Sequence, residues 1–341
     1  MEMKRMKLKR KAEYIGGYKS SKEDSQTMEK IYNGLIGLIV GDAIGAPVEF
    51  LERDSFHLTG MVGYGTHNVP PGTWTDDSSM ALATAESIAR FGRVDANDIM
   101  RNFALWLAKE EFTPYGVTFG VGNTTYNAIE KYLNGIPPLQ CGGTAFRDNG
   151  NGALMRILPL AYTDCDETVI DEVSSLTHAH EISKTACRIY IKIARGVLGG
   201  EDLRKLLKTM ELERDEFRRL PLLASLTRDQ INSSGYVVDT LEAALWSILH
   251  TRNYRNCILR AANLGGDTDT TCAVAGGLAG ILYGTGGTKG IPEKWIAKLA
   301  RIEWITVLCN YFDKRIASKE GVDKLFEICD EYGIDYTRRN Y

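Results

Sequence analysis

Apolar residues recur at helical spacing along most of the chain. Ile31, Leu35 and Leu38 begin this pattern shortly after Met28, and the spacing predicts a helix with a buried face. The same spacing predicts further helices over residues 79–91, 98–109, 167–178, 181–198, 237–250, 254–262, 270–283, 293–313 and 321–332. Runs of alternating β-branched residues, which are typical of strands, are scarce. The pattern therefore predicts an all-α single domain over residues 28–341.

Two segments depart from this pattern. Residues 199–235 are charged and carry no clear motif, so we expect them to cover the surface. Residues 1–27 form a basic arm whose first twelve residues hold six Lys or Arg side chains against Glu2 alone. Like charges in such a block favour either a disordered tail or an arm that docks on an acidic partner, and the sequence leaves both open.

Composition narrows the class of protein. Among 341 residues, 44% are hydrophobic and 25% charged, and the net charge is −3. This ordinary balance excludes a disordered chain, a collagen-like repeat and a disulfide-rich miniprotein. The near-neutral charge gives no reason to expect nucleic acid as a partner. The length allows one or two domains, and the helical pattern favours one.

The cysteines and the apolar stretches indicate a cytoplasmic protein. The seven cysteines are widely spaced without a CxxC pair, at positions 141, 165, 187, 257, 272, 309 and 329. An odd number at such spacings argues against a disulfide framework or a cysteine zinc site and fits a reducing compartment. The longest uninterrupted apolar stretch, residues 272–284, is too short to span a bilayer. No signal peptide and no membrane partner are predicted.

Two acidic clusters each precede a predicted helix. The first lies in Gly72–Ser79 and includes Thr75, Asp76 and Asp77; the second lies in Gly265–Thr271 and includes Asp267, Asp269 and Thr270. One Asp or Ser would suffice to cap a helix. Two carboxylates so close together repel each other unless a cation or a proton separates them. The six oxygen ligands therefore suit a hard cation such as Mg²⁺ or Mn²⁺.

A glycine-rich segment and a histidine pair are the remaining candidates for chemistry. Asn149-Gly150-Asn151-Gly152 predicts either an ordinary turn or a loop whose backbone N–H groups approach a phosphate. His178 and His180 are close enough in sequence to bind a metal. The acidic clusters need no imidazole, so a hydrogen-bonding or core role is favoured for this pair.

Six motifs follow one another along the chain: Gly41-Asp42-Ala43-Ile44-Gly45-Ala46-Pro47-Val48-Glu49, Trp74-Thr75-Asp76-Asp77-Ser78-Ser79-Met80, Asn149-Gly150-Asn151-Gly152-Ala153-Leu154-Met155-Arg156, Leu176-Thr177-His178, Gly235-Tyr236-Val237 and Leu264-Gly265-Gly266-Asp267-Thr268-Asp269-Thr270. Together they resemble the ADP-ribosylglycohydrolase family, which includes the dinitrogenase-reductase-activating glycohydrolase and the ADP-ribosyl-acceptor hydrolases. The resemblance runs from about residue 28 to about residue 295 and leaves the arm outside it. Ser78 stands where many members have Thr, which keeps the hydroxyl.

The resemblance implies an all-α fold, a centre of two divalent cations, Mg²⁺ or Mn²⁺, and hydrolysis of the bond between ADP-ribose and an acceptor side chain. Glu49 would lie near the scissile bond, and either Glu49 or Asp77 would act as the catalytic base. Asp42 would either be structural or orient the metal ligands from behind them. The implied metal ligands are Thr75, Asp76, Asp77, Asp267, Asp269 and Thr270, and the implied substrate-binding residues are Asn151, Gly152, Ala153, Met155, His178 and Tyr236.

The resemblance favours an ADP-ribosylated protein as the substrate and arginine as the acceptor, with serine and small molecules left open. Three other functions are weighed against it. The Asp267-Thr268-Asp269-Thr270-Thr271 segment mimics the DxDxT motif of haloacid-dehalogenase-type phosphatases but lacks the preceding apolar strand. A catalytically silent, crystallin-like member would not need the complete acidic set. An antagonist that also binds an ADP-ribosyltransferase through its basic arm is the third alternative.

Overall fold

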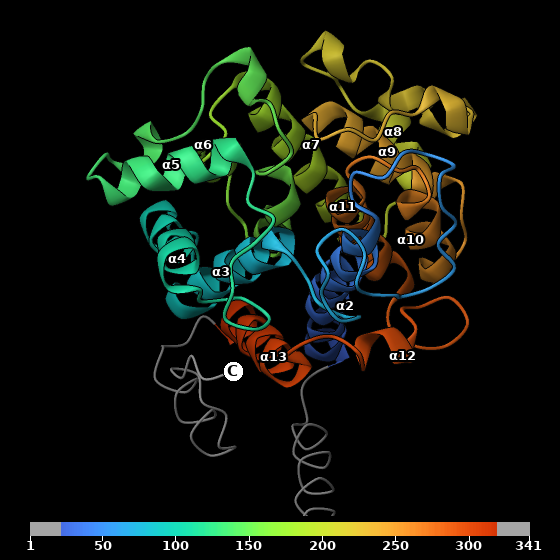
Figure 1. Cartoon of the computed structure of the whole chain (residues 1–341), viewed down its shortest axis with the longest axis horizontal. Coiled ribbons are helices and arrows are strands. Elements are labelled where there is room, and N and C mark those ends of the chain that lie inside the picture. Colours follow the sequence, from blue (N-terminus) through green and yellow to red (C-terminus); the bar gives the residue numbers. More distant parts are fainter. Residues whose placement is uncertain (1–21, 319–341) are drawn as a thin grey trace, which may run out of the picture.

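Residues 22–318 are described by the structure, a computed structural model, and within that range the chain is helical with no strand (Figure 1). The predicted all-α fold is confirmed. The α-helices are α2 (Lys22–Gly45), α3 (Asp76–Phe91), α4 (Ala96–Lys109), α5 (Asn123–Leu133), α6 (Glu167–Ser175), α7 (Glu181–Leu198), α8 (Leu203–Thr209), α9 (Val237–Leu249), α10 (Tyr254–Ala262), α11 (Thr268–Tyr283), α12 (Glu293–Ile296) and α13 (Ile302–Ser318). Short 3₁₀ turns connect them: η1 (Ala46–Val48), η2 (Pro138–Gln140), η3 (Phe146–Asp148), η4 (Leu154–Arg156), η5 (Leu158–Tyr162), η6 (Asp215–Phe217), η7 (Leu220–Ser225) and η8 (Arg228–Gln230).

The predicted helix over residues 293–313 is wrong, because the chain breaks there into α12 and α13. Arg301 adopts a left-handed backbone conformation with φ of 53°, which an α-helix does not accommodate. The N–H of Ala300 donates to the carbonyl of Gly72 at 3.0 Å instead of continuing a helical ladder. A tertiary contact therefore overrides the apolar spacing. The helix predicted over residues 321–332 lies outside the described residues.

Two helices lack the pattern that would have predicted them. In α5, the buried side chains are only Thr125, Ala128 and Ile129, so the helix carries a very narrow apolar face. Helix α8 lies within the charged region 199–235 and begins where the Asp202 side chain accepts a hydrogen bond from the N–H of Lys205. Both helices pack on the outside of larger ones, where little apolar surface is needed.

The N-terminal boundary of the fold lies earlier than the hydrophobic pattern predicts. Helix α2 begins at Lys22, so the last six residues of the predicted arm, 22–27, continue into this helix. Residues 1–21 lie outside the described residues, and the division into an arm and a domain stays a prediction.

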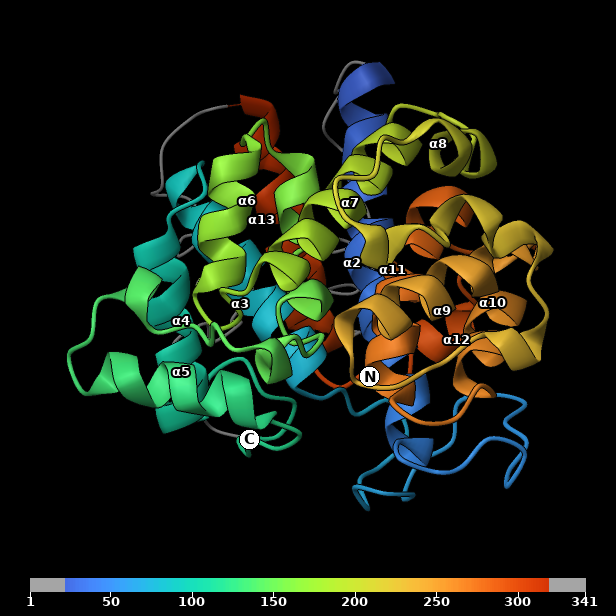
Figure 2. The same cartoon turned by 90° about the horizontal axis from the view of Figure 1, so that it is seen from above.

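Helices α2 and α11 lie side by side at the centre of the molecule (Figures 1 and 2). The pair is antiparallel, because Gly37 of α2 faces Gly276 of α11, whereas Gly45 faces Thr268. A Cβ atom added at Gly37 would lie 2.3 Å from the carbonyl oxygen of Gly276. The backbones approach this closely only because glycine has no side chain. Every α2 glycine in this seam is thus required by the packing.

The remaining helices cover the central pair on two sides. In Figure 2, α3, α4, α5, α6 and α13 lie on one side, and α8, α9, α10 and α12 lie on the other. The window Glu29–Val48 is long and apolar enough to cross a membrane, but 94% of it is buried inside the fold, as in the core helix of a soluble protein. This window is longer than the uninterrupted stretch at 272–284 because it includes the charged residues Glu29, Lys30 and Asp42.

Candidate functional site

The first acidic cluster is held by a carboxylate from the neighbouring helix. Asp42 of α2 is fully buried and accepts hydrogen bonds from the backbone N–H of Thr75, at 2.9 Å, and of Ser78, at 3.1 Å. The hydroxyl of Ser78 also donates to Asp42. These N–H groups belong to the first turn of α3, where no intrahelical partner exists. Asp42 therefore fixes the start of α3 against α2.

The second acidic cluster begins at a double-glycine turn. Gly265 and Gly266 have positive φ angles of 73° and 71°, which residues with a side chain rarely adopt. The next residue, Asp267, is anchored by its N–H, which donates to the carbonyl of Ser233 at 2.8 Å. The hydroxyl of Thr268 donates to the carbonyl of Gly45 at 2.9 Å. The start of α11 is thus attached to the end of α2.

The two clusters meet although they lie almost two hundred residues apart. The hydroxyl of Thr75 lies 3.2 Å from Oδ2 of Asp77 and 3.5 Å from Oδ2 of Asp269. The hydroxyl of Thr270 lies 3.3 Å from the same oxygen of Asp77. The N-termini of α3 and α11 therefore converge on one group of oxygens. Five of the six predicted ligands are buried, and Asp267 is half-buried.

Burial and mutual repulsion make this cluster unfavourable as a set of free carboxylates. Desolvation, followed by the charges of Asp42 and other nearby carboxylates, raises the pKa of Asp76 and of Asp77 well above its usual value. The pKa of Asp269 rises in the same way through burial and the charge of Asp77. Negative charges at this spacing need a compensating positive charge.

The donor set fits one or more hard cations. Within residues 22–318, the buried Oδ1 atoms of Asp77 and Asp267 have no hydrogen-bond partner. The Thr75 hydroxyl has a single proton but lies within 3.5 Å of three carboxylate oxygens, from Asp42, Asp77 and Asp269. Most of these oxygens therefore keep lone pairs directed into the cluster. Carboxylate and hydroxyl oxygens are the ligands that Mg²⁺ and Mn²⁺ prefer.

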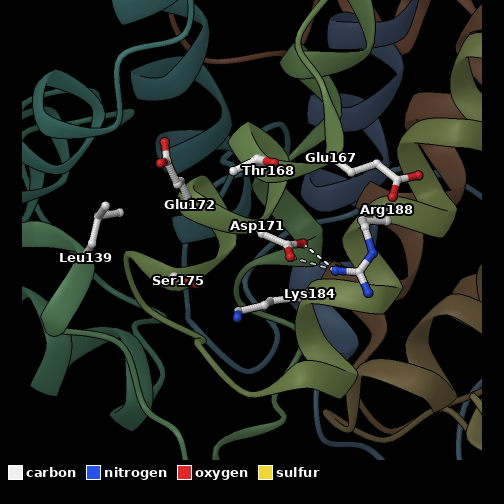
Figure 3. A pocket seen from close by; sticks show the side chains of 8 residues that line it. All are labelled: Leu139, Glu167, Thr168, Asp171, Glu172, Ser175, Lys184 and Arg188. Atoms are coloured by element: carbon white, nitrogen blue, oxygen red, sulfur yellow. Dashed lines mark hydrogen bonds and ion pairs between the residues drawn. The ribbon is translucent and has the colours of Figure 1, made fainter. Parts of the chain in front are cut away.

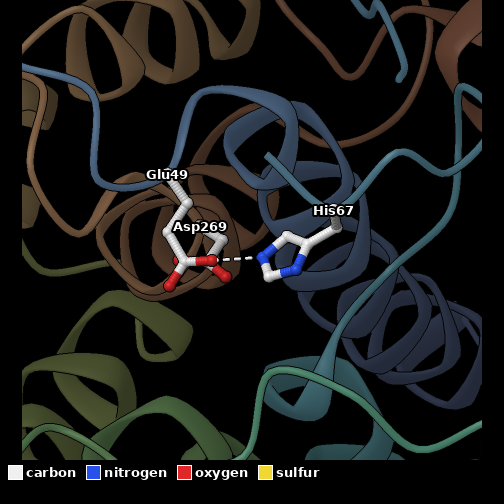
Figure 4. Close-up of side chains that lie close together, drawn as sticks. All are labelled: Glu49, His67 and Asp269. Atoms are coloured by element: carbon white, nitrogen blue, oxygen red, sulfur yellow. Dashed lines mark hydrogen bonds and ion pairs between the residues drawn. The ribbon is translucent and has the colours of Figure 1, made fainter. Parts of the chain in front are cut away.

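Glu49 lies at the edge of this cluster and is paired with a histidine that the sequence pattern did not single out. Oε2 of Glu49 contacts Nε2 of His67, and ligand atoms of these two residues and of Asp269 all lie within 4.8 Å of one another (Figure 4). Glu49 is 6% exposed. The hydrogen bond to Glu49 raises the pKa of His67. A lone histidine in a long loop gives no periodic signal, so only the fold reveals the pairing.

The predicted glycine-rich loop is tied to the start of α9. The N–H of Asn151 donates to the carbonyl of Gly235 at 3.1 Å, and the N–H of Val237 donates to the carbonyl of Asn149 at 3.0 Å. The side-chain amide of Asn151 donates to Oδ2 of Asp267 at 3.0 Å. Two of the sequence motifs are therefore paired, and the loop is connected directly to the acidic cluster.

Three other predicted substrate-binding residues are buried below this loop. Ala153 is fully buried and Met155 is 3% exposed, so their side chains belong to the core. His178 is 2% exposed, and a Cβ atom added at Gly152 would lie 2.7 Å from its Cε1 atom. Burial, aided by the charge of Arg156, lowers the pKa of His178 to about 3. The neutral imidazole thus supports the loop from below.

Two aromatic rings lie beside the loop on its exposed side. Tyr236, predicted to bind substrate, is half-buried, and its ring centroid lies 6.5 Å from that of Phe146. Phe146 is 70% exposed and also packs edge-on against His180 at 6.1 Å. The sequence pattern did not indicate Phe146. An exposed aromatic residue directly before a glycine-rich segment is the signal that could have found it.

A surface pocket of about 400 Å³ between η2, α6 and α7 is separate from the acidic cluster (Figure 3). Its two basic side chains are already paired: Arg188 lies 2.7 Å from Asp171 and 3.0 Å from Glu213, and Lys184 lies 2.9 Å from Glu181. None of its lining residues belongs to the predicted site. The pocket is therefore not part of the acidic cluster or of the glycine-rich loop.

Comparisons with known proteins agree with this geometry. The ADP-ribosylglycohydrolase family model matches residues 23–322, a longer range than the motifs alone cover. The chain is 36% identical to the ADP-ribosylarginine hydrolase Tri1 of Serratia proteamaculans, over 84% of this chain and 80% of that protein. It is 34% identical to the ADP-ribosyl-[dinitrogen reductase] glycohydrolase of Rhodospirillum rubrum, over 80% and 90%. A solved structure described as an ADP-ribosylglycohydrolase-related protein complex aligns with a TM-score of 0.72 and 30% identity, covering 86% of this chain and 99% of that chain.

Proposed function

Since the chain belongs to the ADP-ribosylglycohydrolase family, a family of hydrolases, we propose that it removes ADP-ribose from arginine side chains of modified proteins in a metal-dependent reaction. The names of two relatives support arginine as the acceptor, since the Tri1 proteins of Serratia proteamaculans and Pseudomonas putida are ADP-ribosylarginine hydrolases. A cytoplasmic location belongs to the proposal and is supported by the six free cysteines of the described range.

One observation carries the proposal: the acidic cluster and the glycine-rich loop are joined by a direct side-chain hydrogen bond. The contact between Asn151 and Asp267 joins the loop that we propose binds phosphate to the cluster that we propose binds cations. ADP-ribose has a diphosphate next to the ribose that is bonded to the acceptor. A loop for the diphosphate and a cluster for the ribose hydroxyls would therefore bind adjacent parts of one molecule. The exposed ring of Phe146 and the half-buried ring of Tyr236 would stack on the adenine base.

Thr75, Asp76, Asp77, Asp267, Asp269 and Thr270 would hold two divalent cations, Mg²⁺ or Mn²⁺. When bound, the cations supply Lewis-acid stabilisation and fix the orientation of the groups that react. The unpartnered buried oxygens of Asp77 and Asp267 support this assignment. Asp42 keeps Thr75 in place by accepting its backbone N–H, so the ligand set is positioned before any cation binds.

We propose Glu49 rather than Asp77 as the catalytic base. Oδ2 of Asp77 lies between the hydroxyls of Thr75 and Thr270, so Asp77 is directed into the ligand set. Glu49 contacts His67 through Oε2, and its other oxygen is available to take a proton from the attacking water. The carboxylates around the anomeric carbon would stabilise the positive charge that develops as the glycosidic bond breaks.

The proposal is tested by incubating the full-length protein with an arginine-ADP-ribosylated peptide and a serine-ADP-ribosylated peptide, and measuring free ADP-ribose. We expect release from the arginine peptide with Mg²⁺ or Mn²⁺, and no release in excess EDTA. Asp77→Asn should reduce the rate by at least about 10³-fold, as the loss of a group central to catalysis does. Asp229→Asn makes the same chemical change at an exposed position and should leave the rate unchanged.

Two results would contradict the proposal. Full activity of a metal-stripped sample would remove the metal requirement. Release from the serine peptide alone would leave a hydrolase of this family but would replace arginine as the acceptor.

A further inference from the structure

His67 contacts the Glu49 carboxylate from a loop outside the acidic cluster. Its Nε2 atom contacts Oε2 of Glu49, and the two side chains are 17% and 8% exposed. An ionised carboxylate can only accept hydrogen bonds, so the imidazole donates from Nε2. In Figure 4 the ring points at Glu49 from a different segment of the chain, and Asp269 lies behind the carboxylate.

The loop that carries His67 is docked on the segment that carries Glu49. The hydroxyl of Thr66 donates to the carbonyl of Glu49 at 2.7 Å, and the N–H of Thr66 donates to the carbonyl of Pro47 at 3.0 Å. A Cβ atom added at Gly65 would lie 1.6 Å from that same Pro47 carbonyl oxygen. Glu49 is thus held at its backbone and at its side chain by adjacent residues of one loop.

A second loop also contacts the imidazole. The centroid of the Phe119 ring lies 5.3 Å from that of His67. The next residue, Gly120, has a φ of 82°, and a Cβ atom added there would lie 2.6 Å from Oδ1 of Asp76. The loop therefore reaches both His67 and a predicted metal ligand, and the imidazole contacts both Phe119 and Glu49. A packed ring has few orientations open to it, so its hydrogen bond restricts Glu49 as well.

We propose that His67 is a positioning residue, which holds the Glu49 carboxylate with one oxygen bound to Nε2 and the other free to accept a proton. The inference rests on the proposed function of Glu49 as the catalytic base. Without His67, Glu49 would rotate among several side-chain conformations or turn toward bound cations. Displacing a catalytic group by about 1 Å can reduce a rate by about 10²-fold. The defect should appear in kcat rather than in KM, because this role requires no contact between His67 and the substrate.

The experiment compares His67→Ala, His67→Gln and His57→Ala in the full-length protein, with initial rates on an arginine-ADP-ribosylated peptide. Glutamine places a side-chain N–H at about the reach of Nε2 and preserves the hydrogen bond. We expect His67→Ala to lower kcat by about 10- to 100-fold with KM within about twofold of wild type. His67→Gln should recover most of kcat. His57 is exposed on the same loop, and its replacement should change neither constant.

A second measurement does not depend on activity. The chain has five histidines, so a spectrum of ¹⁵N-histidine-labelled protein is simple to assign by substitution. The Nε2 resonance of His67 should shift in Glu49→Gln and remain unchanged in Asp229→Asn. If wild-type protein releases no ADP-ribose, the proposed function fails, while this spectrum still decides whether His67 binds Glu49.

Three results would overturn the inference. The first is a kcat of His67→Ala equal to that of wild type. The second is a His67 Nε2 resonance whose chemical shift does not change in Glu49→Gln. The third is a His67→Gln variant as impaired as His67→Ala, with weaker Mn²⁺ binding in calorimetry, because this would make His67 a metal ligand.

Discussion

Replacing Gly41 by alanine would force α2 and α11 apart beside the acidic cluster. The added Cβ atom would lie 2.1 Å from the carbonyl oxygen of Cys272, whereas an ordinary contact is at least 3.4 Å. The helices would have to separate by about 1.3 Å, because the obstructing atom is main chain within a helix and cannot rotate away.

The free energy of unfolding should fall. Alanine in a helix interior is favoured over glycine by about 1 kcal/mol. Overpacking of a core costs about 1–3 kcal/mol and sometimes more, and a backbone–backbone clash belongs at the upper end of that range. The net expectation is a destabilisation of about 2 kcal/mol. Asp42, the next residue, holds Thr75, so the two clusters would also separate, and ADP-ribose release should fall at least about 10-fold.

Urea unfolding followed by circular dichroism measures this effect. Gly60→Ala is the matched control, because a Cβ atom added at Gly60 meets nothing within 4 Å. The control should unfold within about 0.5 kcal/mol of wild type or be slightly more stable. The reasoning is refuted if Gly41→Ala is as stable as the control. The added methyl group would then cause no clash, and the contact between α2 and α11 would not be tightly packed at Gly41.

Three further predictions concern charge. Asp77→Asn and Asp269→Asn should each raise the melting temperature of metal-free protein, because each removes one buried carboxylate from a group of carboxylates that repel one another. The control Asp229→Asn should not raise it. A lower melting temperature in both Asp77→Asn and Asp269→Asn would contradict the electrostatic account. Saturating Mg²⁺ should raise the melting temperature of wild type and have no such effect on either variant, as differential scanning fluorimetry can show. Burial raises the pKa of Glu242 to about 7, with Arg219 opposing the shift. The protonated side chain therefore contributes fully to folding stability below pH 4.5, and this contribution is lost as the pH rises through 7. Between pH 5 and pH 8 in urea titrations, the free energy of unfolding of wild type should fall by about 1–2 kcal/mol relative to Glu242→Gln, and parallel curves for the two proteins would contradict this.

Residues whose role follows from local spacing were predictable from the sequence. The Asp76–Asp77 and Asp267–Asp269 pairs each stand before a helix, and both the helices and the convergence of the pairs are found in the structure. The apolar spacing of α7 and α9 likewise predicted their extents within two residues.

Residues whose role depends on a distant contact were not predictable. His67 acquires its partner because its loop folds back on residues 47–49, and no periodicity in a loop encodes that path. Arg301 ends a helical pattern through a contact of the preceding residue with Gly72, more than two hundred residues away. Helix α5 buries only three side chains, so its packing depends on its position in the fold and not on a broad apolar face. In each case the local sequence is compatible with several conformations, and the tertiary contact selects one.

The antiparallel seam between α2 and α11 also determines when the acidic cluster can exist during synthesis. Asp42 and Thr75 are 33 residues apart and can meet while the chain is still short. The bond from Thr268 to Gly45 spans 223 residues, so the second half of the cluster is missing until most of the chain has left the ribosome. Contacts of such long range form late and slowly. A nascent or truncated chain would therefore expose the apolar face of α2 with only the first half of the acidic cluster in place.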